Sequence, residues 1–126
     1  MPHCGDGPIP SRIMLVGEAW GKDEEDVGRP FVGASGMELN RMLHEAGIMR
    51  SECFVTNLVN RRPPNNDLSP PGPDAWIPKR KGDVTSKHTQ LRNLRVLPVV
   101  MDGYNQLMTE IASVQPNIIV ALGNTP

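Results

Sequence analysis

The sequence has few cysteines, almost no net charge and no long apolar run. Its two cysteines, Cys4 and Cys53, lie too far apart to resemble a pair of metal ligands. Neither a signal-peptide pattern nor an apolar stretch of membrane-spanning length is present. We therefore expect a protein of the reducing, cytoplasmic environment that has no membrane partner.

The net charge of −1 at pH 7 differs from the strongly basic character of many nucleic-acid-binding domains. Local clusters can still bind nucleic acid, and basic residues gather between positions 61 and 95. They are Arg61, Arg62, Lys79, Arg80, Lys81, Lys87, Arg92 and Arg95. With 38% hydrophobic residues, a chain of 126 residues can bury one core. We predict a single domain over residues 1–126.

The most informative motif is a carboxylate flanked by glycines. Residues 12–16 are typical of a buried strand, and Gly17-Glu18-Ala19-Trp20-Gly21 follows directly. The glycines would let the backbone turn sharply and let a ligand approach Glu18 closely. An acidic stretch over 22–26 and then Gly28-Arg29-Pro30-Phe31-Val32-Gly33 come next. This order is typical of an active-site loop.

A helix is predicted over residues 36–46. Ser35 and Glu38 have the spacing of a capping box, with Ser35 at the N-cap. Gly47 is placed to end the helix in a left-handed conformation. The apolar residues at helical spacing, expected to form one buried stripe, are Leu39, Met42, Leu43 and Ala46.

The alternation of strands and helices predicts a parallel sheet. Residues 53–59 are mostly apolar and form a second buried strand, and residues 118–122 form a third. The helix before the third strand carries apolar residues at Tyr104, Leu107, Met108, Ile111 and Ala112. We predict an α/β fold with three layers, α/β/α, around a short parallel sheet. Its pocket would lie at the carboxyl ends of the strands, in residues 17–21, 28–33 and 57–66.

Two segments fall outside this alternation. Residues 61–98 are rich in proline and have no sustained hydrophobic period, which predicts a long loop or insertion. At the end of the sequence, Thr125 could be an N-cap and Pro126 the first residue of another helix. We therefore expect the fold to be truncated at its C-terminus.

The order of these motifs resembles that of the uracil-DNA glycosylase superfamily. The matching segments are residues 17–21, 28–33, Phe54-Val55-Thr56-Asn57, Arg62-Pro63-Pro64-Asn65-Asn66 and residues 116–123. The resemblance spans residues 12–126 and is greatest to the iron–sulfur-containing, family 4-like branch. It implies hydrolysis of the N-glycosidic bond of uracil in DNA. Such an enzyme extrudes the base, places a water molecule and stabilises charge on the sugar and on the uracil anion.

The resemblance implies a role for each site residue. Glu18 would orient the attacking water or stabilise the cationic sugar. Phe31 would stack on uracil. Asn57 would pair with O4 and N3–H and so reject cytosine. The structural alternatives are a loop acid for Glu18, a core aromatic for Phe31 and a turn residue for Asn57.

The remaining contacts concern the uracil anion and the DNA backbone. Backbone amides of Ala19, Trp20 and Gly21 would stabilise the anion. Trp20 replaces the proline common in the family, so it could instead be a packing residue or a DNA contact. Arg62 and Asn66, with the basic residues of the insertion, would contact phosphates, although an ordinary solvated charge run is the alternative.

The sequence departs from the family pattern in two places. Family 4 enzymes hold a four-iron, four-sulfur cluster with four cysteines, whereas Arg61 replaces one ligand and residues 101–103 contain none. We expect no cofactor and no metal. The family's C-terminal His motif and DNA-wedging loop are also missing, and His3, His44 and His88 are expected to be ordinary surface residues.

Three functions remain open. The first is a uracil-DNA glycosylase acting on uracil-containing DNA, single-stranded or double-stranded, whose site a second chain or a further C-terminal segment would complete. The second is a module of the same fold that binds DNA or uracil without cleaving it. The third is an unrelated phosphate or nucleotide binder, against which the absence of a Gly-x-x-x-x-Gly-Lys motif argues.

Overall fold

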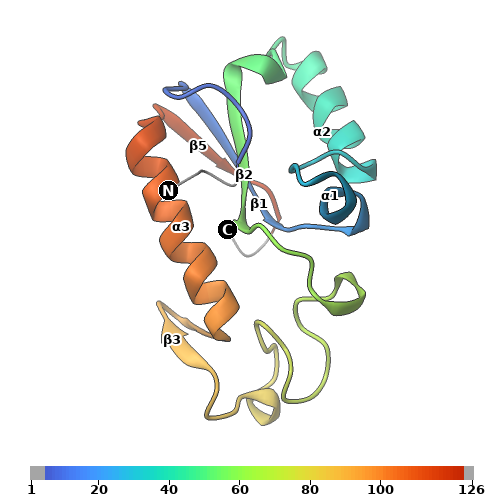
Figure 1. Ribbon diagram of the computed structural model, residues 1–126, viewed down its shortest axis with the longest axis vertical. Helices are drawn as coiled ribbons and strands as arrows, with labels where there is room; N and C mark the ends of the chain where they lie inside the picture. The colour runs from blue at the N-terminus through green and yellow to red at the C-terminus, as the bar shows by residue number, and fades with distance from the viewer. Residues whose placement is uncertain (1–4, 124–126) are drawn as a thin grey trace.

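A three-stranded parallel sheet forms the centre of the molecule (Figure 1). The computed structural model describes residues 5–123, so the helix start expected at Thr125 and Pro126 lies outside the described residues. The strands are β1 (Ile13–Ala19), β2 (Cys53–Val59) and β5 (Ile118–Ala121), in the order β2-β1-β5. The predicted parallel α/β fold is confirmed.

The central strand β1 is longer than the sequence suggested. Gly17 and Ala19 pair in parallel register with Asn57 and Val59 of β2. Gly17 and Glu18 therefore belong to the strand, and the expectation that both lie in a loop was wrong. Regular pairing with β2 continues through the glycine, because a strand accommodates Gly at a small loss in stability.

Two helices lie on one side of the sheet (Figure 1), and the second of them packs against it. Helix α1 (Lys22–Val27) contains the acidic stretch and was not predicted from the sequence. Carboxylates in its first turn interact favourably with the positive end of the helix dipole. Helix α2 (Ala34–Glu45) follows it, and Gly47 has a φ of 73°, as expected of a left-handed residue. The buried residues between α2 and the sheet are Leu15, Leu39, Leu43, Cys53 and Val55.

The start and the buried face of α2 differ from expectation. Gly33, not Ser35, is the N-cap, and no side-chain hydrogen bond caps the helix. Glu38 pairs instead with Arg41, at 2.5 Å, so the predicted capping box does not form. Met42 and Ala46 are exposed, because the helix turns its Leu39–Leu43 side toward the sheet.

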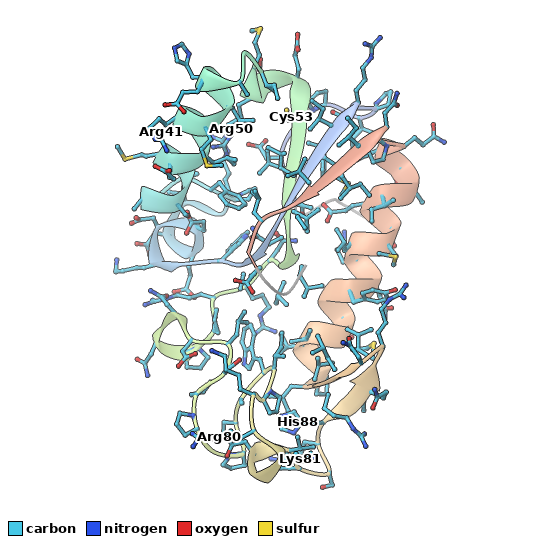
Figure 2. The ribbon with its side chains drawn as sticks, turned by 180° about the vertical axis from the view of Figure 1, so that it is seen from behind. Arg41, Arg50, Cys53, Arg80, Lys81 and His88 are labelled. Carbon is cyan, nitrogen blue, oxygen red and sulfur yellow. The ribbon has the colours of Figure 1, made fainter. Side chains whose placement is uncertain are left out.

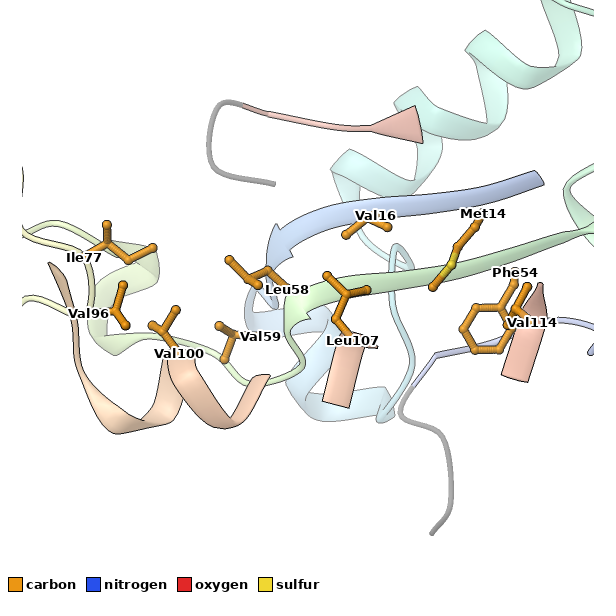
Figure 3. Close-up of a cluster of buried hydrophobic side chains, with 10 residues drawn as sticks. All are labelled: Met14, Val16, Phe54, Leu58, Val59, Ile77, Val96, Val100, Leu107 and Val114. Atoms are coloured by element: carbon orange, nitrogen blue, oxygen red, sulfur yellow. The ribbon is translucent and has the colours of Figure 1, made fainter. Parts of the chain in front are cut away.

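Helix α3 (Pro98–Val114) covers the opposite face and completes the three layers (Figure 1). Figure 3 shows its Leu107 and Val114 among side chains of β1 and β2, and its Val100 beside Ile77 and Val96 of the insertion. Of the expected apolar stripe, Leu107 is buried, Tyr104 and Ile111 are half-buried, and Met108 and Ala112 are exposed. None of the helices within residues 5–123 is long and apolar enough to cross a membrane.

A fully buried carboxyl group connects helix α3 to the sheet and to the N-terminal segment. Glu110 of α3 accepts hydrogen bonds from the hydroxyl of Thr56 and from the backbone N–H of Gly5, each at 2.8 Å. A buried charge is tolerated only when it is hydrogen-bonded. Glu110 thus joins α3, β2 and the N-terminal segment.

Strand β5 is exposed, contrary to the expectation of a third buried strand. Ile118, Ile119 and Val120 are 57%, 48% and 39% exposed. β5 and β2 are both edge strands of the described sheet, but α3 packs closely on β2, whereas within residues 5–123 no helix packs closely on β5. Its apolar sequence therefore indicated the strand but not its burial.

The proline-rich insertion is folded. A short 3-10 turn, Arg50–Glu52, precedes β2, and two more, Pro64–Asn66 and Lys81–Asp83, lie within the insertion. Strands β3 (Thr89–Leu91) and β4 (Leu94–Val96) form an antiparallel hairpin there. The expectation of a long loop was therefore only partly correct.

A buried histidine holds the insertion in place. His88 is 4% exposed, so the expectation of a surface residue was wrong. The backbone N–H of Thr85 donates to Nδ1 of His88 at 3.0 Å, and Nε2 therefore donates to the carbonyl of Ala75 at 2.7 Å. Figure 2 shows His88 in the insertion, far from α2.

We expect His88→Ala to lower the free energy of unfolding by about 1–3 kcal/mol, because it leaves the buried carbonyl of Ala75 without its donor. Urea denaturation at pH 7 measures the change. His44→Ala, on the exposed side of α2, is the matched control and should change stability by less than about 0.5 kcal/mol. Equal effects of the two substitutions would contradict this role of His88.

Candidate active site

The side chains of Phe31 and Asn57 meet at Gly17, near the carboxyl end of β1. Asn57 lies beside Gly17 because their strands pair in register. A Cβ atom built on Gly17 would overlap both the ring tip of Phe31 and Oδ1 of Asn57. Only glycine allows this approach. The structure thus brings together an aromatic ring and an amide, two of the predicted site residues.

The side chain of Asn57 is buried without a hydrogen bond. The residue is 2% exposed, and among residues 5–123 no group makes a hydrogen bond to its side-chain amide. Its backbone carbonyl, by contrast, accepts from Asn60 Nδ2 at 3.5 Å. A buried amide with unmade hydrogen bonds is costly and rare, and therefore suggests a ligand.

Phe31 is held in an unusual backbone conformation. Its φ is 53°, in the left-handed region that side chains other than glycine seldom adopt. The ring is half-buried and packs against the apolar cluster beneath α2. Arg50 donates from Nη1 to the carbonyl of Phe31 at 2.9 Å and from Nη2 to that of Pro30 at 3.0 Å.

Glu24 organises the same loop from its other side. Its Oε2 accepts from the backbone N–H groups of Val32 and Gly33, both at 2.9 Å, and its Oε1 accepts from that of Gly21 at 3.0 Å. Burial alone raises the pKa of this carboxyl, but the hydrogen bonds from Gly33, Val32 and Gly21 lower the pKa below its ordinary value. A buried carboxylate thus joins the loop at residues 28–33 to the start of α1.

Glu18 lies next to Gly17 on β1 but belongs to a neighbouring cavity. This cavity has a volume of about 250 Å³ and is lined by Glu18, Ala19, Trp20, Gly21, Glu24, Ser35, Pro63, Asn66 and Leu68. A Cβ atom built on Gly123, just after β5, would lie 2.8 Å from Oε1 of Glu18. Most of the predicted site residues therefore line one cavity, whereas Phe31, Asn57 and Arg62 are not among its lining residues.

The backbone amides of Trp20 and Gly21 are used within the protein. Trp20 N–H donates to the carbonyl of Arg61 at 3.1 Å, and Gly21 N–H donates to Glu24. The indole Nε1 of Trp20 donates to Oδ1 of Asn60 at 3.2 Å. Both amides therefore have internal acceptors, and their role toward a uracil anion stays a prediction.

The two residues predicted to contact phosphate bind each other. Arg62 Nε donates to Oδ1 of Asn66 at 2.7 Å, and Nη1 of Arg62 lies 3.6 Å from a carboxylate oxygen of Glu25. The exposed carboxylate of Glu25 partly balances the charge of Arg62. Contact of these residues with DNA stays a prediction.

The residues present do not fit an iron–sulfur cluster. Arg61, Asp102 and Gly103, at the positions where cluster cysteines were expected, line one cavity of about 200 Å³ that offers no thiolate. Cys53 is buried in the apolar cluster beneath α2, and burial raises the pKa of its thiol. Over residues 5–123, no three His, Cys, Asp or Glu side chains group closely enough to hold a metal ion.

Comparison with known proteins gives the family. The family model described as uracil DNA glycosylase superfamily matches residues 4–126. The chain belongs to the uracil DNA glycosylase superfamily. The predicted family and fold are thereby confirmed.

Within this superfamily, the chain is similar to type-4 uracil-DNA glycosylases. That of Thermotoga maritima is 35% identical over 121 residues, which cover 96% of this chain and 50% of the relative. That of Archaeoglobus fulgidus is 34% identical over 119 residues, 94% of this chain and 47% of the relative. That of Sulfurisphaera tokodaii is 51% identical over 63 residues, 49% of this chain and 29% of the relative. The chain spans about half the length of the first two relatives.

Two residues that shape the glycosylase-like site were missed in the sequence. The spacing of Gly21 and Glu24 is that of an N-cap and its third helical residue, and it could have indicated that Glu24 turns back to the loop. Arg50 carries no comparable local signal. Its partners at Pro30 and Phe31 lie far away in the sequence, so only the fold reveals them.

The lowered pKa of Glu24 predicts an acid-sensitive contribution to stability. Because its pKa is lower in the folded chain than in the unfolded chain, this contribution is complete above the unfolded pKa of about 4.3 and is lost as the pH falls through the folded pKa. Glu24→Gln should be less stable near neutral pH and should lack this acidic slope. Urea denaturation between about pH 3 and pH 6 measures both effects.

The control for Glu24 is Glu25→Gln, which changes an exposed carboxylate of the same helix. It should follow the parent curve. If the free energy of unfolding falls equally in the parent and in Glu24→Gln as the pH is lowered, Glu24 does not have this role.

Proposed function

We propose that this chain is a uracil-DNA glycosylase that hydrolyses the N-glycosidic bond of uracil in DNA. The observation that carries the proposal is the buried side-chain amide of Asn57, which lacks a hydrogen bond within residues 5–123 and lies, like the ring of Phe31, against Gly17. A planar base with its own donor and acceptor satisfies both groups. Membership in the superfamily makes uracil in DNA the base to test first.

Asn57 is the proposed specificity residue. Its NH₂ group would donate to O4 of uracil, and its carbonyl oxygen would accept from N3–H. Cytosine presents a donor and an acceptor in the opposite order, so it would leave the buried amide unsatisfied. That mismatch costs far more than the loss of an exposed contact. Phe31 would add sequence-tolerant stacking on the base.

Glu18 is the proposed catalytic carboxylate. Water would attack C1′ of the deoxyribose as the bond from C1′ to N1 breaks, and the bonding electrons would leave with uracil as its anion. Glu18 would accept the proton of the attacking water or stabilise the positive charge on the sugar. Because the amides of Trp20 and Gly21 are engaged, the NH₂ group of Asn57 would provide the donor to the anion at O4.

Binding of DNA is assigned to the edge of the Glu18 cavity. Asn66 lines the cavity, and its hydrogen bond with Arg62 holds the guanidinium beside it. Arg62 would contact phosphate, with the other basic residues of the insertion adding affinity that falls as the salt concentration rises.

One observation favours a second function, a module that binds uracil in DNA without cleaving it. The amides of Trp20 and Gly21, expected to stabilise the leaving anion, already have partners. Removal of one preorganised donor commonly lowers a rate by about 10²- to 10³-fold. Such a module would retain Asn57 and Phe31 as its recognition groups.

Substitution of Glu18 separates these functions. We expect Glu18→Gln to reduce release of uracil by about 10²- to 10⁴-fold, because it removes the proton acceptor and the negative charge. Binding of a single-stranded oligonucleotide with one deoxyuridine should remain. Chromatography of released uracil and fluorescence anisotropy measure the two effects.

The control for Glu18 is Glu45→Gln, which changes an exposed carboxylate of α2 that pairs with Arg41 and should match the parent in both assays. Failure of the parent to release uracil at any enzyme concentration, with selective binding retained, would support the binding module. Equal release by the parent and Glu18→Gln would show that this carboxylate is not catalytic.

Substitution of Asn57 distinguishes a ligand-binding amide from a structural one. Asn57→Leu should abolish the preference for uracil over cytosine without lowering the melting temperature, since no protein hydrogen bond is lost. Asn60→Leu is the contrasting variant, because its amide bonds Thr56 and Trp20. It should lower the free energy of unfolding by about 1–3 kcal/mol. Strong destabilisation by Asn57→Leu would contradict the proposed role.

A further inference from the structure

We propose that Arg50 is a positioning residue that sets the ring of Phe31 for stacking on the base. The inference rests on the proposed function and extends it to a residue outside the Glu18 cavity. Arg50 lies in the 3-10 turn between α2 and β2, whereas Phe31 lies in the loop before α2. Figure 2 shows Arg50 on the α2 side of the sheet, near the start of β2.

The guanidinium of Arg50 binds main-chain carbonyls instead of a carboxylate. Nη1 donates to the carbonyl of Phe31 and to Oδ1 of Asn40, both at 2.9 Å, and Nη2 donates to the carbonyl of Pro30 at 3.0 Å. Among residues 5–123, Arg50 forms no ion pair, and nearby Asp6 pairs with Arg29. Its fixed fork of donors therefore serves to hold two consecutive carbonyls.

Arg50 contacts the loop at the residue with its least favourable backbone conformation, Phe31. The left-handed φ of Phe31 is unfavourable for a residue with a side chain, so surrounding groups must impose it. A Cβ atom on Gly36 of α2 would overlap the carbonyl oxygen of Phe31, which shows how closely the helix packs on this peptide. Arg50 holds the carbonyls, while Glu24 holds the amides of Val32 and Gly33.

The orientation of the ring follows from this clamp, defined as Arg50 and Glu24 with the backbone groups they bind. With the peptides on both sides of Phe31 fixed, the ring is directed at Gly17 and Asn57. Loss of Arg50 would free the carbonyls and let the loop relax to an ordinary φ, which turns the ring away. Burial lowers the pKa of the Arg50 guanidinium, in keeping with a group placed there for its geometry.

The test compares Arg50→Met and Arg50→Lys with Arg41→Met. Arg41 is an exposed arginine of α2 that pairs with Glu38 and Glu45, so its substitution removes the same charge without touching the loop. Figure 2 shows both arginines on this side of the molecule. The first measurement is the nuclear Overhauser effect between the ring protons of Phe31 and the α-protons of Gly17. It should be lost in Arg50→Met, weakened in Arg50→Lys and retained in Arg41→Met.

The second measurement is the affinity for a single-stranded oligonucleotide with one deoxyuridine. Arg50→Met should weaken binding about tenfold, the equivalent of one charged hydrogen bond, and Arg50→Lys should weaken it less. Arg41→Met should match the parent. In a Phe31→Ala background, Arg50→Met should have no further effect, because a residue that acts through the ring cannot act without it.

The outcomes separate this inference from the proposed function. A parent that neither binds nor cleaves uracil-containing DNA would overturn the proposed function and, with it, the stacking role of the clamp. A parent that binds, together with an Arg50→Met variant that retains the proton contact or the affinity, would overturn the inference alone. A full effect of Arg50→Met in the Phe31→Ala background would also overturn it.

Discussion

The parallel register of β1 and β2 determines the geometry of the whole site. Pairing of Gly17 with Asn57 places a residue without a side chain beside a buried amide. The missing Cβ leaves room for the ring of Phe31, which comes from a loop outside the sheet. A shift of one residue would turn Asn57 to the opposite face of the sheet. The proposed recognition of a base therefore depends on a feature of strand pairing.

Buried polar groups keep the loop at residues 28–33 in place. Glu24 accepts three backbone hydrogen bonds and Arg50 donates to two carbonyls, so opposite charges hold opposite sides of the same backbone turn. Glu24 is buried and Arg50 is half-buried, and both charges are tolerated because their hydrogen bonds are made. Asn57 is the exception among these groups. That contrast distinguishes the groups that hold the loop in place from the one that we propose to bind a ligand.

Sequence reasoning found the features that depend on local pattern. The apolar runs of β1 and β2 predicted a parallel α/β fold. The glycine-flanked motif pointed to Glu18, which lines a cavity and whose catalytic role stays a prediction. Sequence reasoning missed features that depend on distant partners: β5 is exposed because no helix within residues 5–123 packs closely on it, and His88 is buried where it meets the carbonyl of Ala75. It also assigned Trp20 and Gly21 amides to a ligand, because their internal acceptors cannot be seen in the sequence.

The most direct test of the account is the nuclear magnetic resonance signal of the Asn57 side-chain amide during titration with uracil. The account predicts a shift of this signal with uracil and little change with cytosine at the same concentration, because only uracil matches the donor and acceptor of the amide. The Asn60 amide, already bonded within the protein, serves as the internal reference. An unchanged Asn57 signal, or equal shifts with both bases, would contradict the central claim.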